Sequence, residues 1–123
     1  MKKLLHESIT EDIIGSAFEV HNYLGYGFLE KVYQRAMQVE LLSRNRACEL
    51  ERKLVVKYKN VIVGDYSADL FVEDVVIVEL KVAKQLNVLD DSQLLNELQA
   101  TGEKVGLLIN FGKEKVEFTR MVN

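Results

Sequence analysis

The sequence contains no proline and a single cysteine, Cys48, among its 123 residues. One cysteine excludes an internal disulfide and any zinc site built from several cysteines. Its simplest interpretation is a small hydrophobic side chain that precedes a strand. No repeat, low-complexity stretch or linker interrupts the chain, and its length suits one domain rather than two. We therefore expect a single domain over residues 1–123.

Long apolar segments are also missing. Residues 1–5 are followed at once by His6, Glu7 and Ser8, so the hydrophobic core of a signal peptide does not form. No apolar run approaches the length that spans a bilayer. Hydrophobic residues make up 48% of the chain and charged residues 28%, which are the proportions of a soluble globular protein. These observations predict a cytoplasmic protein with no membrane partner.

The charge is unevenly distributed along the chain. The net charge of −3 argues mildly against generic binding to nucleic acid. Residues 31–60, however, carry eight Lys and Arg against three acids, whereas residues 61–123 carry six against eleven. Any binding of nucleic acid should use this basic segment and weaken as salt rises, and the candidate contacts are Arg44, Arg46, Arg52 and Lys53. A bound cation would offset part of the acidic excess in the second half.

Hydrophobic periodicity divides the chain into helices and strands. The predicted elements are helices over 8–24 and 29–43, strands over 50–58, 61–72 and 75–82, a helix capped by Asp90 or Asp91 and ended by Gly102, and strands over 105–109 and 116–122. Hairpins make the first three strands antiparallel, and the third helix is a right-handed crossover to a parallel fourth strand. The expected fold is α/β, a five-stranded mixed sheet flanked by helices.

Charged residues stand at unexpected places in this pattern. Glu79 and Lys81 lie within the apolar strand 75–82, where a buried charge requires a partner. Residues two apart in a strand point to the same face, so these two side chains project together. Asp69 lies in the preceding strand, and Glu30 opens the second helix on its packed side. The helix dipole alone also favours an acid at that position.

The strand register decides whether Asp69 and Glu79 can meet. A two-residue turn at Glu73–Asp74 would place Asp69 opposite Val78 and separate the two acids. A three-residue turn or a bulge places Asp69 beside Glu79, and Ser67 beside Lys81. The second register also gathers one apolar face, so hydrophobic patterning favours it. The members of that face are Ala68, Leu70, Val76, Val78, Leu80 and Val82.

These residues resemble the GxxExxY proteins, a branch of the PD-(D/E)xK nuclease-like superfamily. The resemblance covers nearly the whole chain and is carried by Gly27-Phe28-Leu29-Glu30-Lys31-Val32-Tyr33, by Tyr66-Ser67-Ala68-Asp69-Leu70, by Glu79-Leu80-Lys81, by Gln93-Leu94-Leu95 and by the segment 106–112. It implies a restriction-endonuclease-like three-layer core and metal-dependent hydrolysis of phosphodiester bonds in DNA or RNA.

The resemblance also implies roles for individual residues. Asp69 and Glu79 would ligate Mg²⁺ or Mn²⁺, with the Leu80 carbonyl as a further ligand. Glu30 would act on the attacking water or on a second ion. Lys81 would orient that water and stabilise phosphoryl charge, and Gln93 would hold Lys81 or the phosphate.

Two further residues of the motif segments have a packing interpretation. His21 follows Ala17 by one helical turn, so packing is at least as well supported as catalysis. Tyr33 fits the core better than the chemistry.

The sequence departs from the family pattern at two positions. Glu97 stands where the family usually has tyrosine, and Tyr26 where the loop commonly has proline. Glu97 would either weaken the approach of a phosphate or face solvent. An active nuclease, an inactive descendant that binds nucleic acid or protein, and a structural ion cluster therefore stay open as interpretations. A homodimer is plausible for a nuclease domain of this size.

Overall fold

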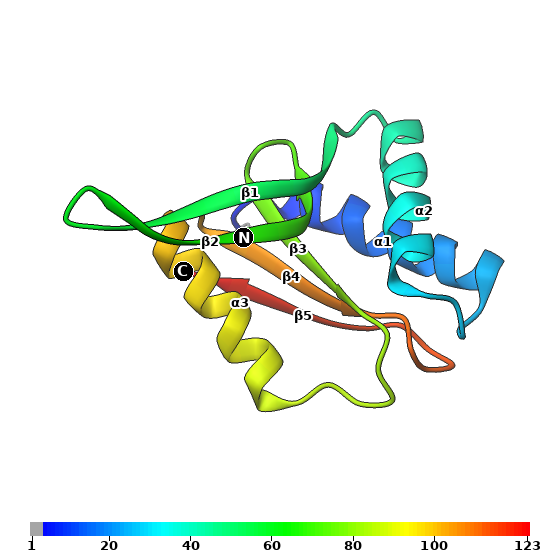
Figure 1. The fold of residues 1–123 in the computed structure, drawn as a ribbon. Coiled ribbons are helices and arrows are strands. Elements are labelled where there is room, and N and C mark those ends of the chain that lie inside the picture. Colours follow the sequence, from blue (N-terminus) through cyan, green and yellow to red (C-terminus); the bar gives the residue numbers. More distant parts are fainter. Residues whose placement is uncertain (1–3) are drawn as a thin grey trace.

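The computed structural model describes residues 4–123. Residues 1–3, on which part of the argument against a signal peptide rests, lie outside the described residues. Within 4–123 the chain forms three helices and five strands (Figure 1). They are α1 (Glu7–Leu24), α2 (Glu30–Ser43), β1 (Cys48–Tyr58), β2 (Val61–Val72), β3 (Val76–Lys81), α3 (Val88–Thr101), β4 (Val105–Asn110) and β5 (Glu117–Val122). None of these helices is long and apolar enough to cross a membrane.

The five strands form one mixed sheet in the order β1-β2-β3-β4-β5. Only the β3–β4 pair is parallel, because α3 connects these two strands as a crossover. The other three pairs are antiparallel. The predicted α/β topology is therefore confirmed.

Helices cover both faces of the sheet, which gives three layers (Figure 1). One apolar cluster joins α1 and α2 to the sheet and includes Ile13, Tyr33, Met37, Leu70, Val78 and Leu80. A second cluster lies under α3 and includes Leu54, Ala68, Phe71, Ile77, Leu94 and Leu98. Strands β3 and β4 are covered on both sides, which explains their continuous apolar sequences.

The β1–β2 hairpin extends well beyond the rest of the sheet (Figure 1). Strand β2 pairs with β3 only over Leu70–Val72, whereas its pairing with β1 continues to Tyr58 and Val61. Lys59 and Asn60 close the hairpin with φ angles of 49° and 67°. A two-residue turn with positive φ at both positions matches the right-handed twist of a hairpin. We call residues 53–66 the arm.

Two predicted helix starts need correction. Helix α1 begins at Glu7 behind His6, which has a φ of 54°, and Ser8 forms no cap; its Oγ instead accepts a hydrogen bond from Arg46 at 2.6 Å. Helix α3 begins at Val88, and Asn87 is its N-cap. Asp90 completes that capping box from the third helical position rather than acting as the cap itself.

Candidate active site

The turn between β2 and β3 sets the register on which the site depends. Val72 pairs with Val76, so three residues form the turn, and Glu73 and Asp74 within it have φ angles of 54° and 56°. Leu70 pairs with Val78. The predicted three-residue turn is confirmed, and this register brings Asp69 level with Glu79.

The two strands separate directly after the Leu70–Val78 pair. There the carboxylate of Asp69 replaces the missing backbone acceptor, since its Oδ2 accepts a hydrogen bond from the Leu80 amide at 2.7 Å. The expected pairing of Ser67 with Lys81 does not form. The hydroxyl of Ser67 instead donates to Glu51 Oε2 at 2.7 Å.

The predicted apolar face is also wrong in two members, since Val82 lies beyond the end of β3 and is 37% exposed, and Ala68 lies on the other side. Ala68 packs under α3 with Leu54 and Phe71, whereas Leu70 packs against α1 and α2. The hairpin twists sharply where it leaves the sheet. Glu51, which lies between the positions paired with Leu70 and Ala68, has a φ of 52°. This local twist overrides the two-residue alternation of strand faces.

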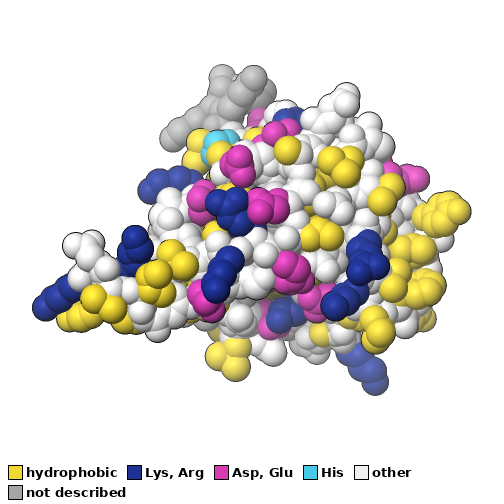
Figure 2. Space-filling view, turned by 45° about the horizontal axis from the view of Figure 1, so that its top comes forward, with side chains coloured by type: hydrophobic (Ala, Val, Ile, Leu, Met, Phe, Trp, Pro, Cys, Tyr) yellow, Lys and Arg dark blue, Asp and Glu magenta, His cyan; other side chains and the backbone are white. Residues whose placement is uncertain are grey.

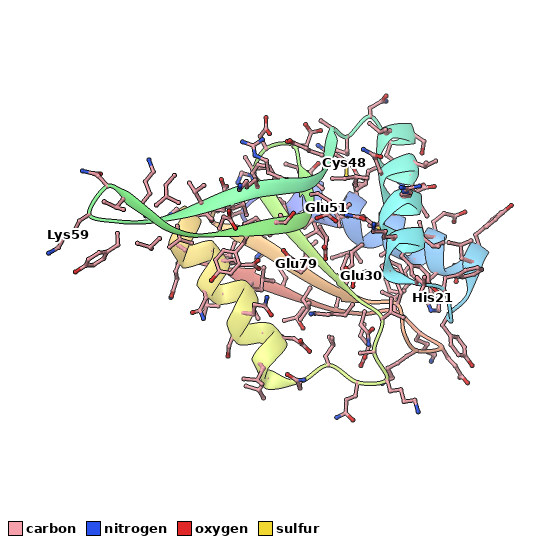
Figure 3. All side chains as sticks on the ribbon, viewed as in Figure 1. His21, Glu30, Cys48, Glu51, Lys59 and Glu79 are labelled. Carbon is pink, nitrogen blue, oxygen red and sulfur yellow. The ribbon has the colours of Figure 1, made fainter. Side chains whose placement is uncertain are left out.

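Three carboxyl groups from three elements meet at this point, and Figure 3 labels two of them, Glu30 and Glu79. Glu30 from α2 and Glu79 from β3 both lie within hydrogen-bonding reach of Asp69 from β2. Burial and then the charge of Asp69 raise the pKa of Glu30 and raise that of Glu79 to about 10. Burial also raises the pKa of Asp69, although the Leu80 amide opposes it. Glu79 Oε1 is buried without a hydrogen-bond partner.

A fourth carboxyl group, that of Glu97 on α3, joins the cluster. Its side chain is 2% exposed, so the alternative that it faces solvent is wrong. Burial and then the charge of Asp69 raise its pKa to about 7, and its Oε2 has no partner. The sequence does hold a sign of this placement: Glu97 lies three residues after Leu94, on the same buried side of the helix.

Lys81 supplies positive charge to these acids. Its charge lowers the pKa of Glu30, Glu79 and Glu97, and its Nζ lies 3.7 Å from Asp90 Oδ1. Gln93, predicted to hold either Lys81 or a phosphate, lines a small cavity beside Lys81 and has an exposed side chain. Asp90 is thus the partner that holds the Lys81 ammonium.

The chain after Lys81 is fixed by the end of β4. The side-chain amide of Asn110 accepts from the Ala83 amide at 3.0 Å and donates to the Ala83 carbonyl at 2.9 Å. The Phe111 amide donates to the Lys81 carbonyl at 2.9 Å. Gly112 approaches so closely that a Cβ there would lie 2.3 Å from the Ala83 nitrogen. These contacts hold the backbone of Lys81 in place.

The segment that resembles the GxxExxY motif positions Glu30. Gly25 and Gly27 have φ angles of 75° and 112°, which L side chains rarely adopt. The hydroxyl of Tyr33 donates to the Gly25 carbonyl at 2.7 Å and accepts from the Phe28 amide at 3.3 Å. Tyr33 is fully buried, so its packing interpretation is confirmed. It ties the loop to the core directly before the residue that begins α2.

His21 also has a structural role. Its Nε2 lies 2.7 Å from the Lys113 carbonyl, and its ring stacks on Phe111 with centroids 6.3 Å apart. The side chain is 7% exposed. Packing therefore accounts for this histidine.

Two polar residues beside Asp69 were missed by the sequence analysis. The side chain of Gln34 donates to the Asp69 carbonyl at 2.9 Å and to Glu51 Oε1 at 2.8 Å. This bond, followed by that from Ser67, lowers the pKa of Glu51. Gln34 lies one turn beyond Glu30, so helical spacing places it on the side of the site. The left-handed backbone of Glu51 has no sequence indicator.

The four predicted nucleic-acid contacts all have acidic neighbours. The pairs are Arg44 with Glu40 at 2.9 Å, Arg46 with Asp12 at 2.7 Å, Arg52 with Glu49 at 2.8 Å and Lys53 with Asp65 at 3.2 Å. Arg46 and its partner join the start of β1 to α1. Much of the positive charge counted in the sequence is therefore balanced locally.

The donor set suits a hard cation even though it is not a closed cage. In residues 4–123, no three His, Cys, Asp or Glu side chains are grouped as a preformed metal centre. Mg²⁺ commonly takes one or two protein carboxylates and completes its shell with water and phosphate oxygens. A cation bound here would give the buried Oε1 of Glu79 a partner. It would also lower the raised pKa of Asp69, because it favours the charged form of a carboxyl group.

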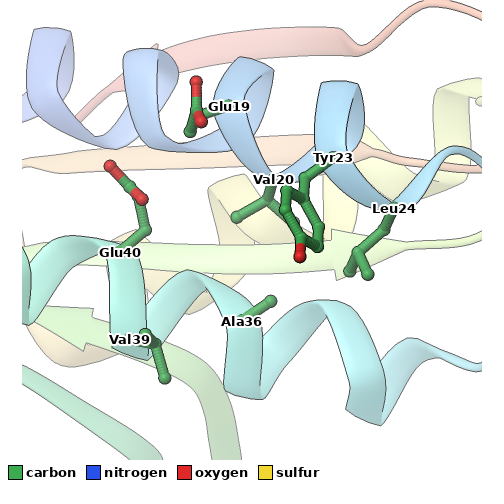
Figure 4. Close-up of a pocket in the computed structure, with 7 residues that line it drawn as sticks. All are labelled: Glu19, Val20, Tyr23, Leu24, Ala36, Val39 and Glu40. Atoms are coloured by element: carbon green, nitrogen blue, oxygen red, sulfur yellow. The ribbon is translucent and has the colours of Figure 1, made fainter.

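A groove of about 350 Å³ between α1 and α2 is separate from these acids (Figure 4). Its lining contains Glu19, Glu40 and apolar side chains such as Tyr23 and Val39, without Lys or Arg. It offers no cation to a phosphate, so it does not extend the site.

Comparisons with known proteins agree with this architecture. A family model described as the PD-(D/E)XK nuclease superfamily matches residues 7–121. A search of curated proteins found no significant match. Among solved structures, the crystal structure of SSO0001 superposes with a TM-score of 0.62 at 14% identity. The alignment covers 96% of this chain and 60% of that one, and at this identity it shows similarity of fold alone.

Proposed function

Because the chain belongs to the PD-(D/E)XK nuclease superfamily, we propose that it is a Mg²⁺- or Mn²⁺-dependent nuclease of the GxxExxY branch. It would hydrolyse phosphodiester bonds of DNA or RNA. The observation that carries this proposal is the meeting of Asp69, Glu79 and Glu30 where β2 and β3 separate. Buried acids with raised pKa values beside one lysine are typical of sites that bind cations or move protons.

Each residue of the site would have its own role in hydrolysis. Asp69 and Glu79 would hold the cation, with the Leu80 carbonyl as a further oxygen donor. When bound, the cation supplies a Lewis acid for phosphate oxygens and lowers the pKa of water. Glu30, whose pKa is raised by burial and by the charge of Asp69, would accept the proton of the attacking water. The Lys81 ammonium would face the charge that develops on the phosphoryl group. Gln93, exposed at the rim, would hydrogen-bond a phosphate oxygen.

A second candidate function is an inactive nuclease-like domain that binds nucleic acid or protein. The observation in its favour is Glu97, a buried fourth carboxyl group next to Glu79. Its added negative charge opposes the approach of a phosphate unless cations offset it. Asp90 also competes for Lys81 at 3.7 Å.

Hydrolysis assays with matched variants separate these functions. Single- and double-stranded DNA and RNA are incubated with the purified chain and Mg²⁺ or Mn²⁺, and products are resolved on denaturing gels. We expect cleavage by the natural sequence and by Glu114→Gln, an exposed acid in the β4–β5 turn. Glu79→Gln and Lys81→Met should each abolish it. Cleavage that persists in both variants would assign the activity to another site or to a contaminant.

We also propose that Arg44, Arg46, Arg52 and Lys53 contact phosphates of the nucleic acid. A homodimer and a cytoplasmic location are further predictions for this chain.

A further inference from the structure

The arm carries positive charge that the chain does not balance. Lys53 pairs with Asp65, but the ion pairs of the described residues include none to Lys57 or Lys59. Lys59 lies at the tip, with its Nζ 5.4 Å from the ring centroid of Tyr58 (Figure 3). The whole chain has a net charge of −3. A basic projection on an acidic protein indicates an anionic partner.

Apolar side chains accompany these lysines (Figure 2). Tyr58, Val61, Ile62 and Val63 are each about three-fifths exposed, and they flank the Lys59–Asn60 turn at the tip of the hairpin. Exposed apolar clusters of this kind mark interaction surfaces. A surface that combines lysine with aromatic and aliphatic side chains suits the phosphates, sugars and base edges of a nucleic acid.

The arm begins at the acid cluster. Glu51 in β1 and Asp69 in β2 stand at its base, and both strands continue outward from them. Lys31 and Arg35 are exposed one turn apart on α2, and Lys31 is close enough to lower the pKa of Glu51. The base of the arm therefore has a cationic group from α2 beside it, in addition to the lysines of the arm itself.

We propose that the arm is a DNA-binding ribbon that lies in the major groove of the duplex whose phosphate is held at Asp69 and Glu79. This inference rests on the proposed nuclease function. The major groove of B-DNA, about 12 Å wide, admits a two-stranded ribbon, whereas the minor groove of about 6 Å does not. The deep, narrow major groove of A-form RNA excludes it as well. The ligand is therefore double-stranded DNA.

The reach of the arm agrees with this placement. Eight residues separate Asp69 from Val61, which at about 3.3 Å per residue gives about 26 Å. That length is shorter than one helical turn of DNA, about 34 Å, so the tip stays within the groove adjoining the held phosphate. A second copy of this chain fits less well, because two arms rich in lysine would repel each other.

Duplex binding with charge-reversed variants tests the proposal without requiring cleavage. The Glu79→Gln background prevents hydrolysis, and anisotropy of a labelled 25-bp duplex (about 2.5 turns) measures affinity between low and moderate salt. We expect Lys57→Glu/Lys59→Glu to weaken binding at least about tenfold and to reduce the salt slope by about 2. The control, Lys113→Glu/Lys115→Glu in the β4–β5 turn, should bind the duplex as tightly as the Glu79→Gln protein does. Tyr58→Ala/Ile62→Ser should weaken duplex binding without changing the salt slope.

Several outcomes would overturn the proposal. One is an affinity for duplex DNA that the arm variants leave unchanged or reduce no more than the control does. Another is an equal loss of affinity for single-stranded DNA or for an RNA duplex. An arm variant that converts a dimer to a monomer in sedimentation would assign the arm to a second copy. A larger loss on reversal of Arg44 and Arg52 than of the arm would place the duplex on those residues instead.

Failure of the arm and failure of the nuclease proposal are distinguishable. Bis(p-nitrophenyl) phosphate is too small to span from Asp69 to the arm, so its metal-dependent hydrolysis by the natural sequence tests the site alone. Hydrolysis with arm-independent duplex binding overturns only the arm. Arm-dependent duplex binding without hydrolysis of any diester supports the arm and overturns the nuclease.

Discussion

Asp69 Oδ2 accepts a hydrogen bond from the Leu80 amide at 2.7 Å, at the first position where β2 and β3 no longer pair. One oxygen of the acid thus completes the sheet, and the other is left for the neighbouring carboxyls or a cation. The carboxylate is fixed by backbone rather than by a flexible partner. This arrangement holds the carboxylate in one position and exposes it to the charge of its neighbours.

The affinity for Mg²⁺ should rise with pH. Burial and Asp69 raise the pKa of Glu79 to about 10, so near neutral pH this carboxyl holds a proton that the cation must displace. For one released proton, the apparent association constant rises about tenfold per pH unit below that pKa. Calorimetry at pH 6.5, 7.5 and 8.5, repeated in buffers of different ionisation enthalpy, measures both the affinity and the proton. An affinity that does not depend on pH, or that survives in Asp69→Ala, would place the ion elsewhere.

Without metal, stability should fall as pH rises. Burial and Asp69 raise the pKa of Glu97 from its ordinary value of 4.5 to about 7 in the folded protein, so the folded state binds the proton more tightly than the unfolded state. The resulting stabilisation is fully present below pH 4.5 and is lost as the pH passes through about 7. Melting temperatures in EDTA at pH 5 to 8 should decline. Glu97→Gln should make the decline shallower without removing it, because the pKa of Glu79 is also raised, to about 10. Glu114→Gln, an exposed acid, should leave the decline unchanged.

Tyr33→Phe should destabilise the fold by about 1–2 kcal/mol, since it removes one buried hydroxyl that bonds both Gly25 and Phe28. The aromatic packing on Phe111, with centroids 4.6 Å apart, is retained. Urea unfolding followed by circular dichroism measures the change. Tyr23→Phe is the control, because Tyr23 is 87% exposed and bonds nothing in the described part of the chain. Equal stability of the two variants would show that the hydroxyl does not hold the loop before Glu30.

Gly112→Ala should destabilise by about 1–3 kcal/mol because its Cβ would meet the Ala83 backbone at 2.3 Å. Since Ala83 follows Lys81 closely, any catalytic activity should fall with stability. Gly64→Ala in the arm is the matched control, as a Cβ there meets nothing within 4 Å. A Gly112→Ala protein with the melting temperature of the control would contradict the close contact seen between the ends of β3 and β4.

The sequence predicted the element order, the sheet topology and the β2–β3 register correctly. Register is readable because a slip of one residue would turn Leu70, Val78 and Leu80 away from the core. The packing interpretation of Tyr33 is confirmed, and of the two interpretations left open for His21 the structure supports packing. Helical spacing places both residues on the packed side.

The remaining differences come from backbone conformations that residue type does not reveal. His6, Glu51, Glu73 and Asp74 all have positive φ without being glycine. The conformation at Glu51 accompanies the twist that moves Ala68 to the α3 side and brings Gln34 to Glu51. Of the two alternatives for Glu97, only exposure to solvent is wrong, because its spacing from Leu94 places it on the buried side of α3.

The register of β2 against β3 is set by the turn at 73–75, at the opposite end of β2 from Lys59 and Asn60. Residues can therefore be inserted or removed in matched pairs at the tip of the hairpin without shifting Asp69 relative to Glu79. The length of the arm can therefore change while the relative positions of the Asp69 and Glu79 carboxylates stay the same. Such a design lets evolution, or an engineer, vary the footprint on a ligand while the chemistry at its base stays constant.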